Sequence, residues 1–125
     1  MLFRSSYIAK VKGVREVMVA LQRRLGRGTN SVLDGRDIGT VVFPDADRKF
    51  YIDADFQERV MRRFKEQIEA GRKVTSTDVS ADLSNRDTID STREIAPLKR
   101  AEDAIYIDTT KMSINEVVDV LLRHI

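Results

Sequence analysis

Short apolar runs alternate along this chain with longer segments in which apolar residues recur at helical spacing. The runs at residues 31–34, 48–53 and 104–107 have the length and composition of strands. Strands that alternate with helices are typical of a parallel sheet, because a crossover must carry the chain back before the next parallel strand can form. The sequence therefore predicts one α/β domain, in which helices flank a parallel sheet.

Four helices are predicted around these runs, and each has a start or stop signal. They cover residues 14–26, 55–71, 77–93 and 113–125. Asp55 with Glu58, and Ser113 with Glu116, have the spacing of a capping box. The last helix carries an apolar stripe that is expected to be buried: Ile114, Val117, Val118, Leu121, Leu122 and Ile125.

Composition excludes several classes of protein. Hydrophobic residues make up 42% of the 125 residues and charged residues 34%, which describes a folded globular chain and not a disordered one. The absence of cysteine excludes disulfides and thiolate metal sites, and the single His124 excludes a histidine cluster or a histidine-based triad. No apolar run approaches the about 18 residues that a membrane span needs, and no export signal is recognisable. A cytoplasmic location without a membrane partner is expected.

Charge is nearly balanced, with 22 basic and 20 acidic residues. Nucleic-acid binding is therefore not expected. Arg23, Arg24 and Arg27 form a local basic patch, which is read either as a solvated helix end or as an interaction surface. Aromatic residues, which interleave with basic ones in single-strand binding surfaces, make up only 6% of the chain and count against the second reading.

The first apolar run ends abruptly in Asp34-Gly35-Arg36-Asp37, with Gly39 two residues further on. A guanidinium held among carboxylates can grip a phosphate, and a carboxylate can accept a hydrogen bond from a base amino group. The other reading is a glycine-containing surface turn that happens to carry three charges. Spacing alone does not separate the two readings.

Arg86, Asp90 and Arg93 share one helix face, since they are spaced i, i+4 and i+7. The helix that carries them is expected to begin at a cap, Thr77 or Asp78. Two guanidiniums beside a carboxylate could clamp a phosphoryl group and a sugar hydroxyl. The alternative is a ladder of salt bridges within the helix.

Residues 34–46, DGRDIGTVVFPDA, closely resemble bacterial cytidylate kinases, a nucleoside-monophosphate kinase family with a P-loop fold. Further matching motifs lie at residues 50–54, 58–59, 62–63, 85–87, 90, 93, 96–98 and 104–110. The resemblance covers nearly all of this chain but only about the C-terminal half of the family's usual length. It implies that residues 1–125 are the C-terminal part of a cytidylate kinase domain, with a lid region at about 65–95.

The P-loop itself is missing from the sequence. A phosphate-cradling loop needs Gly, four residues, Gly, Lys and then Ser or Thr, and none of the six glycines is followed by lysine and a hydroxyl residue. In the resemblance the three predicted strands are the third, fourth and fifth of five, and the P-loop strand separates the third from the fourth. The fold is thus expected to be partial, with a gap in its core that implies marginal stability, a rearranged fold or dependence on a partner.

The resemblance also assigns substrate-binding roles. Asp37 would accept from the cytosine amino group, and Arg36 would hold the acceptor phosphate. Arg15 would contact the base or the monophosphate. Ser6 and Asp90 would bind the sugar.

The remaining roles concern catalysis and ATP. Arg86 and Arg93 would grip sugar or phosphates while the phosphoryl group is transferred, so Arg93 also counts as a substrate-binding residue. Arg63 is a candidate for the ATP side. No residue is expected to ligate magnesium directly, and Asp34 would either orient the water around Mg²⁺ or cap the Gly35 turn.

The function that the resemblance implies is transfer of the γ-phosphoryl group of ATP to CMP or dCMP, with Mg²⁺, giving CDP or dCDP in pyrimidine nucleotide metabolism. The full-length protein is expected to be a monomer. Because the P-loop is absent, the alternative is an inactive fragment that only binds a pyrimidine nucleotide or another anion.

Overall fold

Two compact units divide the chain in the computed structural model, which describes residues 7–125. Unit 1 comprises Met1–Asp47, described from residue 7, together with Asn85–Glu102. Unit 2 comprises Arg48–Ser84 and Asp103–Ile125. Each unit is therefore built from two separate stretches of chain.

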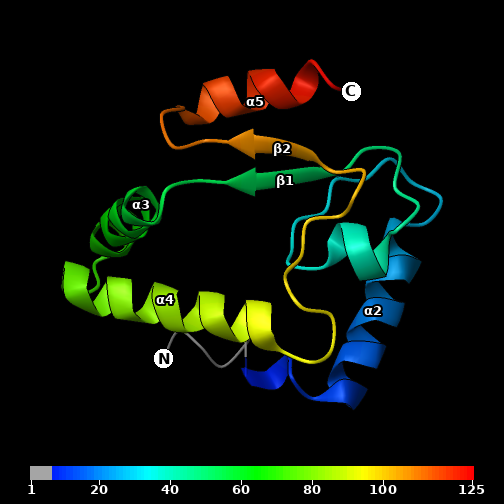
Figure 1. Cartoon of the computed structure of the whole chain (residues 1–125), viewed down its shortest axis with the longest axis horizontal. Helices are drawn as coiled ribbons and strands as arrows, with labels where there is room; N and C mark the ends of the chain where they lie inside the picture. The colour runs from blue at the N-terminus through cyan, green and yellow to red at the C-terminus, as the bar shows by residue number, and fades with distance from the viewer. Residues whose placement is uncertain (1–6) are drawn as a thin grey trace. The chain divides into compact units, whose positions relative to one another are not determined.

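Unit 2 contains the sheet (Figure 1). Its two strands, β1 (Phe50–Asp53) and β2 (Ile105–Asp108), run parallel, with Phe50 opposite Ile105 and Asp53 opposite Asp108. Aromatic and β-branched residues such as these favour the extended chain because their side chains pack well on a pleated surface. The predicted α/β class with a parallel sheet is confirmed.

Helix α3 (Phe56–Glu69) follows β1 and begins after Asp55, as predicted. The predicted capping box is only half formed, because the Asp55 N–H donates to Oγ1 of Thr110 at 2.8 Å and not to Glu58. The Asp55 carboxylate accepts hydrogen bonds from the backbone N–H groups of Gln57 and Glu58, at 2.9 and 3.4 Å. Glu58 pairs with Arg62 on the next turn, 2.8 Å away. The Asp55 side chain therefore carries the cap. The helix stops before Gly71, whose φ of +73° is a left-handed conformation that glycine adopts without strain.

Helix α4 (Ser76–Thr92) begins earlier than predicted, and the predicted cap at Thr77 or Asp78 is wrong. The Thr75 hydroxyl accepts from the Asp78 N–H at 3.1 Å, while the Asp78 carboxylate accepts from the Thr75 N–H at 3.0 Å. Thr75 is thus the capping residue, and Asp78 is its partner three residues later. Both residues can accept from backbone N–H groups, so sequence alone did not separate them.

Helix α5 (Ile114–Leu122) begins with the predicted capping box, in which Ser113 and Glu116 bond each other's backbone N–H. Its C-terminal end lies close to the start of β1, since the ring centroids of His124 and Phe50 are 6.2 Å apart. The expected burial of its apolar stripe is wrong: Ile114 is 83% exposed and Leu122 is 62% exposed. An amphipathic pattern specifies which face is apolar, but the rest of the fold decides whether anything covers that face.

Unit 1 contains α2 (Lys12–Gly26), which matches the predicted helix. The predicted strand at 31–34 is wrong: these residues are irregular, and Val32 is 97% exposed. A strand exists only as part of a hydrogen-bonded ladder, and residues 31–34 have no neighbouring strand among those described. Instead the next element is η1 (Ile38–Val42), a single turn of π-helix that lies beside α2 in Figure 1.

Each unit has a small core of its own. Val42 and Ile89 are buried in unit 1, and the buried apolar side chains of unit 2 are Val60, Val79, Ala104 and Ile107. Within residues 7–125 no helix combines the length and the apolar character that crossing a bilayer demands.

Candidate functional site

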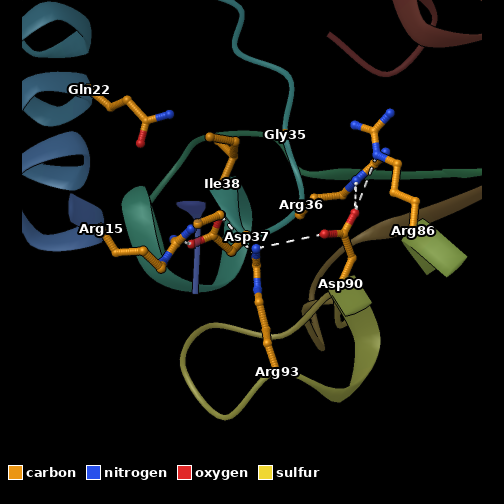
Figure 2. Close-up of a pocket in the computed structure, with 10 residues that line it drawn as sticks. Arg15, Gln22, Gly35, Arg36, Asp37, Ile38, Arg86, Asp90 and Arg93 are labelled. Carbon is orange, nitrogen blue, oxygen red and sulfur yellow. Dashed lines mark hydrogen bonds and ion pairs between the residues drawn. The ribbon is translucent and has the colours of Figure 1, made fainter. Parts of the chain in front are cut away.

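A pocket of about 190 Å³ opens in unit 1 (Figure 2). This volume lies below the range of about 300–1,000 Å³ that is usual for small-molecule sites, so it suits one ring-sized part of a ligand. Segments that are distant in the sequence contribute to its lining: Ala9, Arg15, Gln22, Gly35, Arg36, Asp37, Ile38, Arg86, Asp90 and Arg93.

Asp37 is the acidic residue on one side of the pocket. It stands at the N-terminal end of η1 and is 7% exposed. Its Oδ2 accepts a hydrogen bond from Nη2 of Arg15, which reaches it from α2. Its Oδ1 faces Nη2 of Arg93 at 3.8 Å. Two guanidiniums therefore share one buried carboxylate.

Asp90 is the second acidic residue and is 3% exposed on α4. Its Oδ2 accepts a hydrogen bond of 2.9 Å from Nε of Arg36, and Nε of Arg86 lies 3.6 Å from the same oxygen. Its Oδ1 is 3.9 Å from Nη1 of Arg93. The dashed lines of Figure 2 show that Arg93 lies between the two carboxylates.

The backbone after α4 holds Arg93 in this position. Nε of Arg93 donates a 2.5 Å hydrogen bond to the carbonyl of Ala96, and the Leu98 N–H donates to the carbonyl of Asp90 at 2.6 Å. Ala96 has a φ of +50°, a left-handed conformation that is strained for a residue with a Cβ. This tight turn ahead of Pro97 directs the carbonyl of Ala96 toward the side chain of Arg93.

The Arg93 guanidinium is nearly free of solvent contact. Burial lowers its pKa from the ordinary value, as does the charge of Arg15, whereas Asp37 and Asp90 raise the pKa and Arg36 lowers it again. Nη2 is buried and makes no hydrogen bond to any atom of residues 7–125. Because a buried donor without an acceptor is costly, this N–H is suited to a ligand atom that accepts a hydrogen bond.

The charged side chains that line the pocket suit an anion that also carries hydrogen-bond donors. Four arginines face only two aspartates, so positive charge is in excess. Arginine forks match phosphate oxygens in geometry and charge. The two carboxylates can accept from amino or hydroxyl groups of a ligand.

Gly35 lets the chain pass close to the pocket. A Cβ at this position would lie 2.8 Å from Cγ1 of Ile38, closer than side chains pack. Gln22 also lines the pocket, and sequence reasoning missed it. Its signal was available, since it follows Arg15 by seven residues and therefore shares its helix face.

Six of the residues singled out from the sequence meet in this pocket: Arg15, Arg36, Asp37, Arg86, Asp90 and Arg93. Ser6 lies outside the described residues. Asp34 is exposed and does not line the pocket, and Arg63 belongs to unit 2, where it pairs with Glu66 at 2.6 Å. Asp34 is thus not brought to the arginine cluster.

No group of three His, Cys, Asp or Glu side chains within residues 7–125 could hold a metal ion.

A sheet flanked by helices and a pocket rich in arginine define an α/β protein whose pocket lining suits an anionic small molecule. Among protein families, the one described as "Cytidylate kinase" has a sequence model that matches residues 2–125. The chain belongs to the cytidylate kinase family.

Individual relatives carry the same family name. The chain is 49% identical to the cytidylate kinase of Clostridioides difficile (strain 630) over 120 residues, which are 96% of this chain and 56% of the relative. It is 50% identical to that of Geobacillus sp. (strain WCH70), over 94% of this chain and 53% of the relative. It is 49% identical to the cytidylate kinase of Halalkalibacterium halodurans, over 90% of this chain and 50% of the relative. The chain spans about half the length of these curated relatives.

Proposed function

We propose that this chain forms the monophosphate-binding part of a cytidylate kinase, which transfers the γ-phosphoryl group of ATP to CMP or dCMP and gives CDP or dCDP. The observation that carries the proposal is the convergence of four arginines and two aspartates on one pocket of unit 1. Membership of the cytidylate kinase family supports the same chemistry. Pyrimidine nucleotide metabolism in the cytoplasm is the setting, and the full-length enzyme acts as a monomer.

The base is read by Asp37 and Arg93. A carboxylate acceptor, Oδ1 of Asp37, lies 3.8 Å from a guanidinium donor, Nη2 of Arg93. Cytosine presents an amino donor directly beside a ring-nitrogen acceptor, which is the complementary order. Uracil presents a carbonyl acceptor beside an N–H donor, so the same pair would meet acceptor with acceptor and donor with donor. This mismatch favours CMP over UMP.

Arg36 and Arg86 hold the phosphate, and Asp90 accepts from a sugar hydroxyl. Both arginines already point at Asp90, at 2.9 and 3.6 Å from its Oδ2. When a monophosphate enters, its oxygens replace part of this pairing. The acceptor oxygen then attacks the γ-phosphorus as the bond to ADP breaks, and no general base is needed, because the acceptor is already anionic. Arg86 stabilises the charge that spreads over the transferred group. Arg93, which was expected beside it, is assigned to the base instead, because its Nη2 lies 3.8 Å from Oδ1 of Asp37.

Bound together with ATP, Mg²⁺ would supply neutralisation of charge on the phosphates. The sequence has no Gly-x4-Gly-Lys-Ser/Thr loop. This absence favours a second candidate, in which residues 1–125 alone bind a pyrimidine nucleotide without turnover.

Titration calorimetry with CMP, dCMP and UMP, combined with a coupled assay of ADP release, tests both candidates. We expect the chain to bind CMP more tightly than UMP and to release no ADP on its own. ADP release that depends on CMP would favour the complete enzyme over the binding fragment. Equal affinity for CMP and UMP would contradict the assignment of Asp37 as the base reader.

A further inference from the structure

Arg23 has a partner that the basic-patch interpretation did not foresee. It lies on α2 one residue beyond Gln22, and it is partly buried, whereas Arg24 is exposed. Its Nε donates a 2.9 Å hydrogen bond to the carbonyl of Val42, and its Nη2 donates a 2.7 Å hydrogen bond to the carbonyl of Val41. The guanidinium therefore binds the C-terminal end of η1 through two of its nitrogens.

The peptide groups that Arg23 holds are the ones that hold Asp37. The backbone N–H groups of Val41 and Val42 both donate to the carbonyl of Asp37, at 2.9 and 3.2 Å. The peptide between Val41 and Val42 thus accepts from Arg23 at its carbonyl and donates to Asp37 at its N–H. Hydrogen bonds in such a chain polarise and strengthen one another.

A turn of this kind needs support. A π-helix is rare, usually occurs as a single turn, and is frequently found at functional sites. It places Asp37 at its N-terminal end, with its carboxylate in the pocket. With the carbonyls of Val41 and Val42 released, the turn can relax toward ordinary helical hydrogen bonding, and the direction of the Asp37 side chain changes with it.

We propose that Arg23 is a positioning residue for the base-reading carboxylate: it clamps the π-turn and so sets the discrimination between cytosine and uracil. It does not line the pocket, and it acts through the backbone of η1. The proposal rests on the proposed function, because it requires Asp37 to read the base. Arg15 orients the same carboxylate from the side-chain direction, whereas Arg23 fixes its backbone.

The test compares Arg23→Gln and Arg23→Lys with the matched control Arg24→Gln on the same helix, all in the full chain. Affinities for CMP and UMP are measured by titration calorimetry, and exchange rates of the Val41 and Val42 amides by NMR. We expect Arg23→Gln to weaken CMP binding about 10-fold with little change for UMP, and to speed exchange of both amides. Arg23→Lys, which keeps the charge but loses the fork, should fall between the wild type and Arg23→Gln. Arg24→Gln should match the wild type.

The outcomes separate the two levels of the proposal. If the wild type prefers CMP and folded Arg23→Gln keeps the same ratio of affinities, the positioning role is wrong even if thermal stability falls. Should Arg23→Gln fail to fold, an unchanged CMP-to-UMP ratio in Arg23→Lys would overturn the proposal in the same way. A wild type without preference for CMP would overturn the proposed function, and the positioning role with it.

Discussion

Nη2 of Arg93 lies 3.8 Å from Oδ1 of Asp37, at the centre of a network that joins α2, η1 and the end of α4. The separation is right for an ion pair and too long for a hydrogen bond. The two groups are therefore attracted to each other, while each keeps hydrogen-bonding capacity on the side that faces the pocket. A ligand edge with a donor beside an acceptor can use both.

Replacing Arg93 should cost both stability and binding. Arg93→Met leaves Asp37 and Asp90 buried with less compensating charge, so we expect the free energy of unfolding to fall by about 1–3 kcal/mol. CMP binding should become undetectable by calorimetry. Arg27→Met, at an exposed position of the same unit, is the control and should change neither quantity. Unchanged CMP affinity in Arg93→Met would contradict the site.

Replacing Asp37 by asparagine should change specificity more than affinity for anions. An amide cannot serve as a charged acceptor for the cytosine amino group, but its N–H can donate to the uracil carbonyl. The ratio of CMP to UMP affinity should fall about 10-fold or more. Asp45→Asn, which alters an exposed carboxylate beyond η1, should leave the ratio unchanged. An unaltered ratio in Asp37→Asn would show that another residue reads the base.

Acid should weaken the start of α4. Hydrogen bonds from the Thr75 hydroxyl and then from its backbone N–H hold the pKa of Asp78 below its usual value of 3.8. The folded state thus binds this proton more weakly than the unfolded state, so the stabilisation is present above pH 3.8 and disappears as the pH falls through the lower folded pKa.

The check is helicity by circular dichroism at neutral pH and at pH values below 3.8. Asp78→Asn should be less stable than the wild type near neutrality, and the difference should shrink in acid. Thr75→Ala removes the hydroxyl and should raise the pKa of Asp78 toward its ordinary value. A difference between wild type and Asp78→Asn that stays constant with pH would rule out this linkage.

The different exposure of two isoleucines of unit 2 predicts a large loss of stability for replacing one and a small change for replacing the other. Ile107 is buried in β2, so Ile107→Ala should lower the free energy of unfolding by about 2–4 kcal/mol. Ile114 is exposed at the start of α5, so Ile114→Ala should change it by about 0.5 kcal/mol or less. Urea unfolding of the full chain measures both. A large cost at Ile114 would mean that the apolar stripe of α5 is covered in solution.

Features that depend on neighbouring residues were predictable. The Asp55 cap and the Ser113–Glu116 capping box involve groups within one helical turn, so the sequence contains both partners. The cap of α4 was misplaced because Thr75, Thr77 and Asp78 all carry suitable acceptors within four residues. The prediction of a strand at 31–34 was wrong because a strand forms only beside a second strand. An apolar run does not show whether that neighbouring strand exists.

The sequence by itself predicted the four α-helices, two strands of a parallel sheet and, through its motifs, the cytidylate kinase family. Only the tertiary structure decided that Arg15, Asp37 and Arg93 meet, that Arg23 turns from the surface to the carbonyls of a π-turn, and that the stripe on α5 stays exposed. The physical reason is range. Helix periodicity and capping are local along the chain, whereas ion pairs, ladders and burial depend on residues that are distant in sequence and brought together by folding.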